Sequence, residues 1–268
     1  MLSFSTLGCF DRSLDEIIAL AKKYGIEIIE IRGIGGKINN SEITEFSEPC
    51  ATKTKQKLEK AGIFPFILGT SASFHSPENY EAKMKEARES VAIASRMGIP
   101  NIRVFGDKIE GDREECLLRV INGISELCSF AESFGVGVLL EVHGHFNTKE
   151  TLLPVAEALS SRSNFGIIWD IEHSHKVYGE GWEDFYLAIR PYIKHVHIKD
   201  YNDTLAALSP IGEGNVPIAP IITRLIKDGY SGAFSLEWEE KWHPELGKIE
   251  PALDAFVRIA REAKCAAR

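Results

Sequence analysis

Four side chains that commonly bind metal ions recur at regular spacing in the second half of the chain, and each one closes a short apolar run. They are Glu141, Asp170, His197 and Glu237. Consecutive members lie 29, 27 and 40 residues apart, close to one strand and one helix in each case. At one edge of parallel strands, three carboxylates would repel one another unless a cation neutralised them. The spacing therefore predicts a divalent-metal site.

The donor atoms of this group limit the choice of metal. Three carboxylates and one imidazole form a hard to borderline set, which suits Mn²⁺ or Mg²⁺ and tolerates Co²⁺ or Zn²⁺. We expect Mn²⁺ first among these ions. A single carboxylate at a strand end is more often a helix cap or half of an ion pair, but four ligand-type residues at matched spacing favour the metal.

The strands that must position these side chains can be counted along the chain. Eight short apolar or β-branched runs alternate with segments of helical period, such as 78–97, and Gly25, Gly62 and Gly98 follow helical patterns. This alternation predicts a closed (β/α)8 TIM barrel, which we expect to form one domain over 1–268. The expected strands are 2–7, 26–31, 63–68, 101–105, 136–142, 165–169, 193–198 and 233–238.

Composition excludes several classes of protein. The chain has 31 Lys and Arg against 39 Asp and Glu, a net charge of −8, and no basic run near the predicted site, so we expect no nucleic-acid partner. Its five cysteines are scattered without paired spacing, which argues against a disulfide framework. We see no secretion signal at the start and no run of transmembrane length, so we expect a cytoplasmic protein without a membrane partner.

The segments around these residues resemble the sugar phosphate isomerase/epimerase family of xylose isomerase-like barrels. That family also includes the apurinic endonucleases of the endonuclease IV type. The resemblance covers nearly the whole chain, and its most specific stretch is Ile-Gly-Glu-Gly-Asn-Val-Pro at 211–217, followed by 228–239. Its other marks are the segments 5–9, 13–16, 28–32, 103–106, 140–144, 169–170 and 195–200.

The resemblance implies roles for individual residues. It implies a metal held by the same four residues that the spacing selects, with Glu141 and Glu237 also acting as the catalytic acid and base. It further implies that His143 and His173 point at the substrate. For each of these two histidines, a hydrogen-bonded loop residue is the alternative.

Three basic residues near the strand ends are further candidates for substrate binding. Lys199 shares strand parity with His197, so it should face the barrel mouth, where it could hold a substrate oxygen or phosphate. Arg32 and Arg103 could do the same. The alternative is that each arginine neutralises a buried carboxylate such as Glu30.

The expected function is therefore isomerisation or epimerisation of a sugar or sugar phosphate through a metal-stabilised enediolate. Dehydration of an inosose or dehydroshikimate is the alternative within the resembled family, which also implies a homodimer or homotetramer. An apurinic endonuclease is disfavoured, because Ala206 and Leu208 stand where those enzymes carry an Asp-x-His pair. A metal-free binding protein is disfavoured because all four ligand positions hold ligand-type residues. The identity of the sugar stays open.

Overall fold

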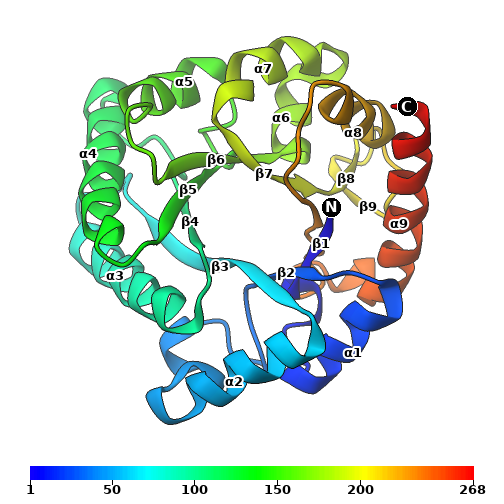
Figure 1. Ribbon diagram of the computed structural model, residues 1–268. Helices are drawn as coiled ribbons and strands as arrows, with labels where there is room; N and C mark the ends of the chain where they lie inside the picture. Colours follow the sequence, from blue (N-terminus) through cyan, green and yellow to red (C-terminus); the bar gives the residue numbers. More distant parts are fainter.

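Eight parallel strands close into a barrel ringed by helices in the computed structural model, which describes residues 1–268 (Figure 1). The predicted TIM barrel is confirmed: each barrel strand pairs with the next barrel strand along the chain, and β1 closes the barrel by pairing with both β2 and β10. The barrel strands are β1 (Leu2–Ser5), β2 (Ile28–Ile31), β3 (Phe64–Ser73), β4 (Asn101–Phe105), β5 (Gly137–Glu141), β6 (Phe165–Asp170), β7 (Ile193–Ile198) and β10 (Phe234–Leu236).

The helices lie on the outside of the barrel, and none of them combines the length and the apolar character that crossing a membrane requires. The α-helices are α1 (Leu14–Tyr24), α2 (Glu48–Ala61), α3 (Tyr80–Met97), α4 (Arg113–Glu132), α5 (Lys149–Ala158), α6 (Ile171–Tyr178), α7 (Trp182–Ile189), α8 (Ile218–Lys227) and α9 (Ile249–Ala266). Short 3-10 helices are η1 (Thr6–Cys9), η2 (Asn40–Glu42), η3 (Thr44–Phe46), η4 (Gly179–Gly181), η5 (Arg190–Tyr192) and η6 (Pro244–Leu246).

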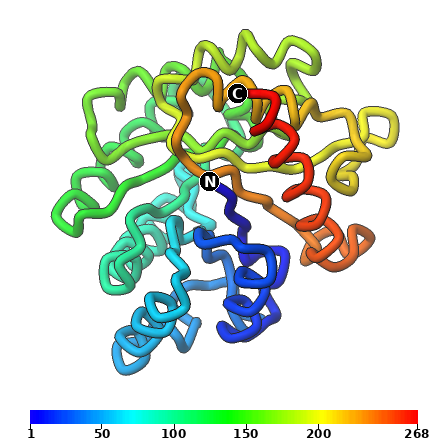
Figure 2. Tube along the Cα trace, turned by 45° about the vertical axis from the view of Figure 1, so that its right-hand side comes forward, coloured from blue at the N-terminus to red at the C-terminus, as the bar shows by residue number.

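Local sequence signals explain where the first helix begins and ends. Ser13 and Glu16 form a reciprocal capping box at the start of α1, and Gly25 ends the helix in the left-handed conformation at φ 64°. The first and last α-helices are then joined directly, since the Tyr24 hydroxyl donates to the Glu250 carbonyl oxygen at 3.1 Å. Figure 2 shows the C-terminal helix returning to the side of the molecule where the chain begins.

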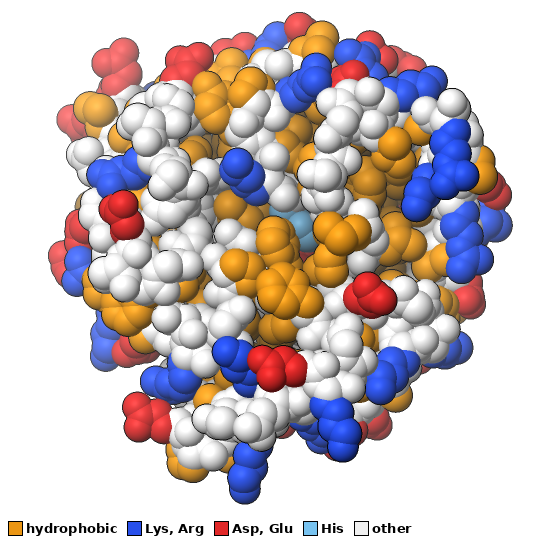
Figure 3. Space-filling model, viewed as in Figure 1, with side chains coloured by type: hydrophobic (Ala, Val, Ile, Leu, Met, Phe, Trp, Pro, Cys, Tyr) orange, Lys and Arg blue, Asp and Glu red, His pale blue; other side chains and the backbone are white.

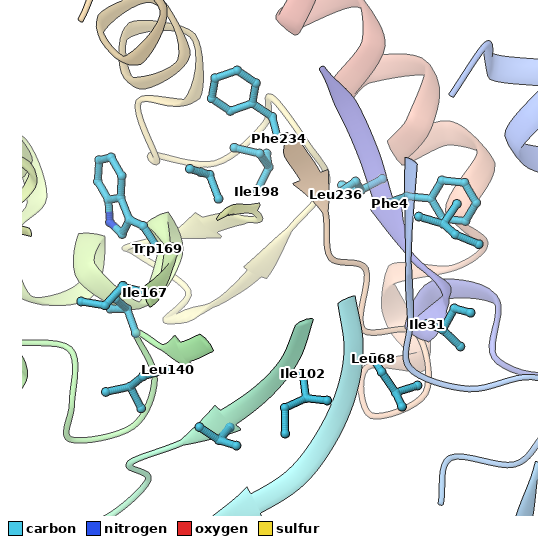
Figure 4. Close-up of a cluster of buried hydrophobic side chains, with 14 of the residues drawn as sticks. Phe4, Ile31, Leu68, Ile102, Leu140, Ile167, Trp169, Ile198, Phe234 and Leu236 are labelled. Atoms are coloured by element: carbon cyan, nitrogen blue, oxygen red, sulfur yellow. The ribbon is translucent and has the colours of Figure 1, made fainter. Parts of the chain in front are cut away.

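Alternation along the strands separates an apolar outer layer from the barrel interior. Figure 4 shows apolar strand side chains pointing away from the barrel axis, among them Leu140, Trp169, Ile198 and Leu236. The residue that follows each of them therefore faces inward. A small separate cluster of Ile67, Leu139 and Ile168 lies inside the barrel, one layer below the inward-facing strand ends. This layer also holds the buried Glu30 and His195, which pair with Ile67 and Ile168 in the sheet, so the floor of the site is only partly apolar.

Hydrophobic side chains also gather over the centre of the face of the barrel that Figure 3 shows, while most Lys, Arg, Asp and Glu side chains lie toward its periphery. Phe64, a large hydrophobic residue at the start of β3, is 48% exposed. Phe66, two residues further along the same strand, packs against the inner apolar cluster.

A short antiparallel hairpin follows β7 and was not expected from the sequence. It consists of β8 (Asp200–Asn202) and β9 (Ala207–Ser209). The buried Asp200 carboxylate tethers the loop that follows, because it accepts hydrogen bonds from the backbone N–H groups of four residues at 2.8–3.2 Å. These residues are Tyr201, Gly212, Gly214 and Val216. The Ile-Gly-Glu-Gly segment therefore folds around one carboxylate.

Replacing Asp200 with Ala is expected to lower the free energy of unfolding by about 2–4 kcal/mol, because buried N–H donors lose their acceptor. Asp200→Asn should cost less, since its amide oxygen still accepts. Urea unfolding followed by circular dichroism measures both. The exposed neighbour Asp203 is the control, and Asp203→Asn should change stability by less than about 1 kcal/mol. Equal effects at the two positions would contradict the tether.

Candidate active site

The four residues selected by spacing converge at the ends of adjacent strands. Glu141, Asp170 and His197 lie in β5, β6 and β7, and Glu237 directly follows β10. Each offers one ligand atom, and these four atoms all lie within 4.8 Å of one another with every residue buried. The structure thus brings together the set that strand spacing predicted.

The orientation of His197 is fixed from behind by a carboxylate. Its Nε2 lies 2.9 Å from Glu30 Oε2, while the other Glu30 oxygen lies 2.7 Å from His195 Nε2. The opposite ring nitrogen, Nδ1, is buried without a hydrogen-bond partner and lies 3.5 Å from Glu141 Oε1 and 3.4 Å from Glu237 Oε2. A carboxylate that holds one nitrogen while the other faces a ligand set is the arrangement found behind metal-bound histidines.

Asp170 also directs one oxygen into the group. Its Oδ1 accepts from the N–H groups of Glu172 and His173 at the start of α6, which leaves Oδ2 facing the cluster. Oδ2 is buried and makes no hydrogen bond. Lys199 Nζ lies 2.8 Å away and forms an ion pair with it, but the angle between the two groups does not suit a hydrogen bond. Burial raises the pKa of this carboxyl, and Lys199 offsets that effect only in part. One carboxylate oxygen from each of Glu141, Asp170 and Glu237, together with a ring nitrogen of His197, would fit a divalent cation.

Two cationic side chains pair with the same carboxylates. Arg103 Nη1 lies 3.0 Å from Glu141 Oε2 and 2.9 Å from Glu237 Oε1. Burial opposes ionisation of both carboxyls, yet Arg103 lowers the pKa of Glu141, and Lys199, His197 and Arg103 together hold the pKa of Glu237 well below its usual range. Arg103 therefore neutralises the central carboxylates, whereas the two histidines partner Glu30.

A cavity of about 260 Å³ opens beside this group. It is slightly smaller than the ~300–1,000 Å³ typical of drug-sized ligands, which suits a small molecule. Of the residues expected to act at the site, those that line it are Arg32, Arg103, Glu141, His143, Lys199 and Glu237.

The two candidate histidines are placed differently. His143 lines the cavity between Phe105, with ring centroids 4.8 Å apart, and His173, at 4.2 Å. Burial lowers the pKa of His143, so its ring is neutral at pH 7, and Nδ1 has no hydrogen-bond partner. His173 lies against His143 and not on the cavity wall, and burial holds its pKa well below the usual range.

Sequence reasoning missed several residues of the cavity, among them Glu239 and Trp242. Glu239 lies 2.6 Å from Lys199 Nζ and completes a set of three carboxylates around that ammonium, and Trp242 lines the cavity with half of its surface exposed. Glu239 stands two residues after Glu237, and the same period of two that placed Lys199 beside His197 could have found it.

Comparison with known proteins adds the family. Residues 18–259 match the family described as "xylose isomerase-like TIM barrel". Among curated proteins, an uncharacterised protein of Methanocaldococcus jannaschii is 31% identical over 149 residues, which is 52% of this chain and 48% of that protein. The C-glycoside deglycosidase alpha subunit of Arthrobacter globiformis is 34% identical over 86 residues, which is 32% of this chain and 22% of the relative. The matches therefore span about half of the first relative and about a fifth of the second.

Solved structures share the fold over almost the whole chain. A D-tagatose 3-epimerase-like protein has a TM-score of 0.78 at 20% identity, covering 99% of this chain and 97% of that one. The IolI protein with a bound zinc atom gives 0.77, also at 20% identity and with the same coverage. The probable 3-DHS dehydratase AsbF of Bacillus anthracis gives 0.75 at 20% identity, covering 100% of this chain and 98% of that one.

Proposed function

Because the chain belongs to the family of xylose isomerase-like TIM barrels, we propose that it is an enzyme, a divalent-metal-dependent isomerase or epimerase of a sugar or sugar phosphate. The observation that carries this proposal is the convergence of Glu141, Asp170, His197 and Glu237 on one point beside a small cavity. The names of the solved structures, which include an epimerase-like protein and a dehydratase, support chemistry next to a carbonyl group.

The four residues would hold the ion through one atom each, and Mn²⁺ is our first choice. When bound there, a divalent ion polarises a carbonyl and its adjacent hydroxyl and stabilises the negative charge of an enediolate. The protein supplies the remaining chemistry. Glu30 keeps His197 oriented, and the inner apolar cluster lies inside the barrel one layer below the site.

We assign proton transfer to the two glutamates. Glu141 Oε1 and Glu237 Oε2 face His197 Nδ1. Glu141 Oε2 and Glu237 Oε1 lie beside Arg103, and these are the oxygens that we assign to proton exchange with a substrate carbon. Arg103 favours the ionised form of both, which is the form a base needs. The two residues come from β5 and the end of β10, separated by β6 and β7, so they can approach a planar enediolate from different sides.

His143 and Lys199 would orient the substrate. A neutral imidazole with a free Nδ1 can donate or accept a hydrogen bond with a hydroxyl, depending on its tautomer. Lys199 Nζ contacts Asp170, Glu237 and Glu239, and its pKa is raised well above the usual value because these carboxylates outweigh burial, so it stays charged beside the cavity. His173 would act through His143, since it packs behind that ring.

The test is proton exchange with solvent. The Mn²⁺-loaded protein, incubated in deuterated water with a panel of free, phosphorylated and carboxylated ketoses and aldoses, is expected to convert a member of the panel and to deuterate the carbon next to its carbonyl. NMR follows both. Protein stripped by a chelator is the control and should do neither. If metal-saturated protein converts and labels no member of the panel, the proposed function is wrong.

Dehydration remains the second candidate, supported by two groups on the cavity wall: neutral His143 could take a proton from carbon, and charged Lys199 could give one to the departing hydroxyl. The same experiment separates the two, because a dehydratase releases water and forms a carbon–carbon double bond. An apurinic endonuclease stays disfavoured. Ala206 and Leu208 lie in and beside the β8–β9 hairpin and offer no metal ligand.

A further inference from the structure

Arg32 differs from the other two cations of the cavity in having no carboxylate partner. Arg103 and Lys199 each lie within 3.0 Å of at least two carboxylates. No carboxylate oxygen lies within 4.0 Å of the Arg32 guanidinium, although only 6% of the residue is exposed and it lines the same cavity. The positive charge of Arg32 is therefore uncompensated at short range.

The guanidinium of Arg32 is nevertheless held firmly by neutral groups. Nη1 donates to the Ile38 carbonyl oxygen at 3.0 Å, Nη2 donates to Ser71 Oγ at 2.6 Å, and Nε is buried without a partner. The aliphatic stem lies against Gly69 of β3, where a Cβ atom would be only 2.5 Å from Arg32 Cδ. The fold thus leaves out a side chain at Gly69 and fixes an arginine with donor capacity to spare.

Burying the charged guanidinium of Arg32 costs free energy, and the neutral groups that hydrogen-bond to it do not offset that cost fully. Burial, followed by the charge of Arg103, lowers the pKa of Arg32 to about 10, so the side chain remains protonated at pH 7 but in surroundings that disfavour its charge. A buried charge is normally paired, and arginine binds carboxylate and phosphate through two parallel N–H groups. An anion that enters the cavity could supply the partner that Arg32 lacks.

We propose that the substrate carries an oxyanion, a carboxylate or a phosphate, that binds Arg32 while its carbonyl end lies at Glu141 and Glu237. Ser71 supports this subsite, because its Oγ accepts from Arg32 and its hydroxyl hydrogen is free to donate to the same anion. The inference rests on the proposed function and narrows its substrate class. The substrate is a hydroxy ketone that carries either a carboxylate or a phosphate group, and not a neutral sugar.

Three ketoses that differ only at C6 provide the test: D-fructose, D-fructuronate and D-fructose 6-phosphate. In calorimetric titrations, we expect the wild-type protein to bind one or both anionic ketoses at least tenfold more tightly than D-fructose. Comparing D-fructuronate with D-fructose 6-phosphate shows whether the subsite prefers a carboxylate or a phosphate. Arg32→Met should weaken binding of the preferred anion by about 10- to 100-fold and so remove most of its advantage over D-fructose. Arg113→Met is the matched control, because it removes the same charge from an exposed position at the start of α4.

The outcomes separate this inference from the function beneath it. If the wild type binds neither anion more tightly than D-fructose, the subsite is wrong, even where deuterium exchange supports the enzyme class. If the anion preference is present but no exchange occurs, the proposed function is wrong instead. Arg32→Lys keeps the charge without the planar fork and should lose part of the preference, so it serves if Arg32→Met does not fold.

Discussion

The double variant His197→Ala, Asp170→Ala is expected to lose stoichiometric Mn²⁺ binding, whereas the wild type should bind about one ion per chain. The loss should exceed the ~10–100-fold that removal of an outer hydrogen-bond partner costs, because two of the four donor atoms disappear. In wild-type protein, His197 Nδ1 and Asp170 Oδ2 are the two unpartnered buried atoms that face the cluster from β7 and β6. Isothermal titration and elemental analysis measure the affinity and the stoichiometry.

A second histidine and aspartate pair in the same part of the molecule gives a matched control. His175 Nε2 lies 3.1 Å from Asp203 Oδ1, outside the cluster, so His175→Ala with Asp203→Ala removes the same two side-chain types. This control should retain one Mn²⁺ per chain. Glu30→Gln should give an intermediate loss of about 10–100-fold, since it leaves all four ligands but weakens the orientation of His197. Full binding by the double variant would refute the site.

The position of the four ligands could be predicted from sequence because it depends on local regularities that add up along the chain. In a (β/α)8 barrel, one strand and one helix make up each repeating unit, so strand ends recur at similar spacing along the chain. Side chains also alternate between the two faces of each strand. Leu140, Trp169 and Leu236 point outward, so the ligand that directly follows each of them points inward. His197 points inward because it directly precedes the outward-facing Ile198. Spacing and parity were therefore sufficient.

The charge partners inside the barrel could not be predicted in this way. Arg103 pairs with Glu237, 134 residues later in the chain, and Glu30 pairs with His195, 165 residues later. Which acceptor a long side chain reaches depends on the relative height of side chains from different strands, which no local pattern encodes. For the same reason, nothing in the sequence indicated that Arg32 would lack a carboxylate.

The end of β3 was also placed wrongly, and the cause is chemical. The sequence predicted an end at residue 68, where the apolar run stops and Gly69, Thr70 and Ser71 follow. β3 continues to Ser73, with an irregular register between Gly69 and Ser73. Thr70 Oγ1 donates to the Arg103 carbonyl oxygen at 2.6 Å, so a side-chain hydroxyl continues the pairing across this irregularity. The extension carries Ser71 to the cavity, where it meets Arg32.

Glu237→Gln is expected to lower kcat by about 10²–10⁴-fold, the range typical of lost acid–base catalysis, while Mn²⁺ binding weakens less. Glutamine preserves the shape and one coordinating oxygen but cannot take a proton from carbon. Its amide would also meet cations on both sides, since Arg103 Nη1 lies 2.9 Å from Glu237 Oε1 and Lys199 Nζ lies 2.8 Å from Oε2. Glu141→Gln should behave similarly, because Glu141 shares Arg103. Turnover is measured on the ketose identified by deuterium exchange.

A control must separate loss of the base from loss of an arginine partner. Glu250 also pairs with an arginine, with Arg12 Nη2 at 2.7 Å from Oε1, but it lies on α9 outside the cavity, so Glu250→Gln should leave kcat close to that of the wild type. In deuterated water, the catalytic variants should also label the substrate carbon more slowly, in proportion to kcat, if the glutamates move the proton. Near-normal turnover by Glu237→Gln with Mn²⁺ still bound would mean that a different group removes the proton. His143, the neutral imidazole on the cavity wall, would then be the next residue to replace.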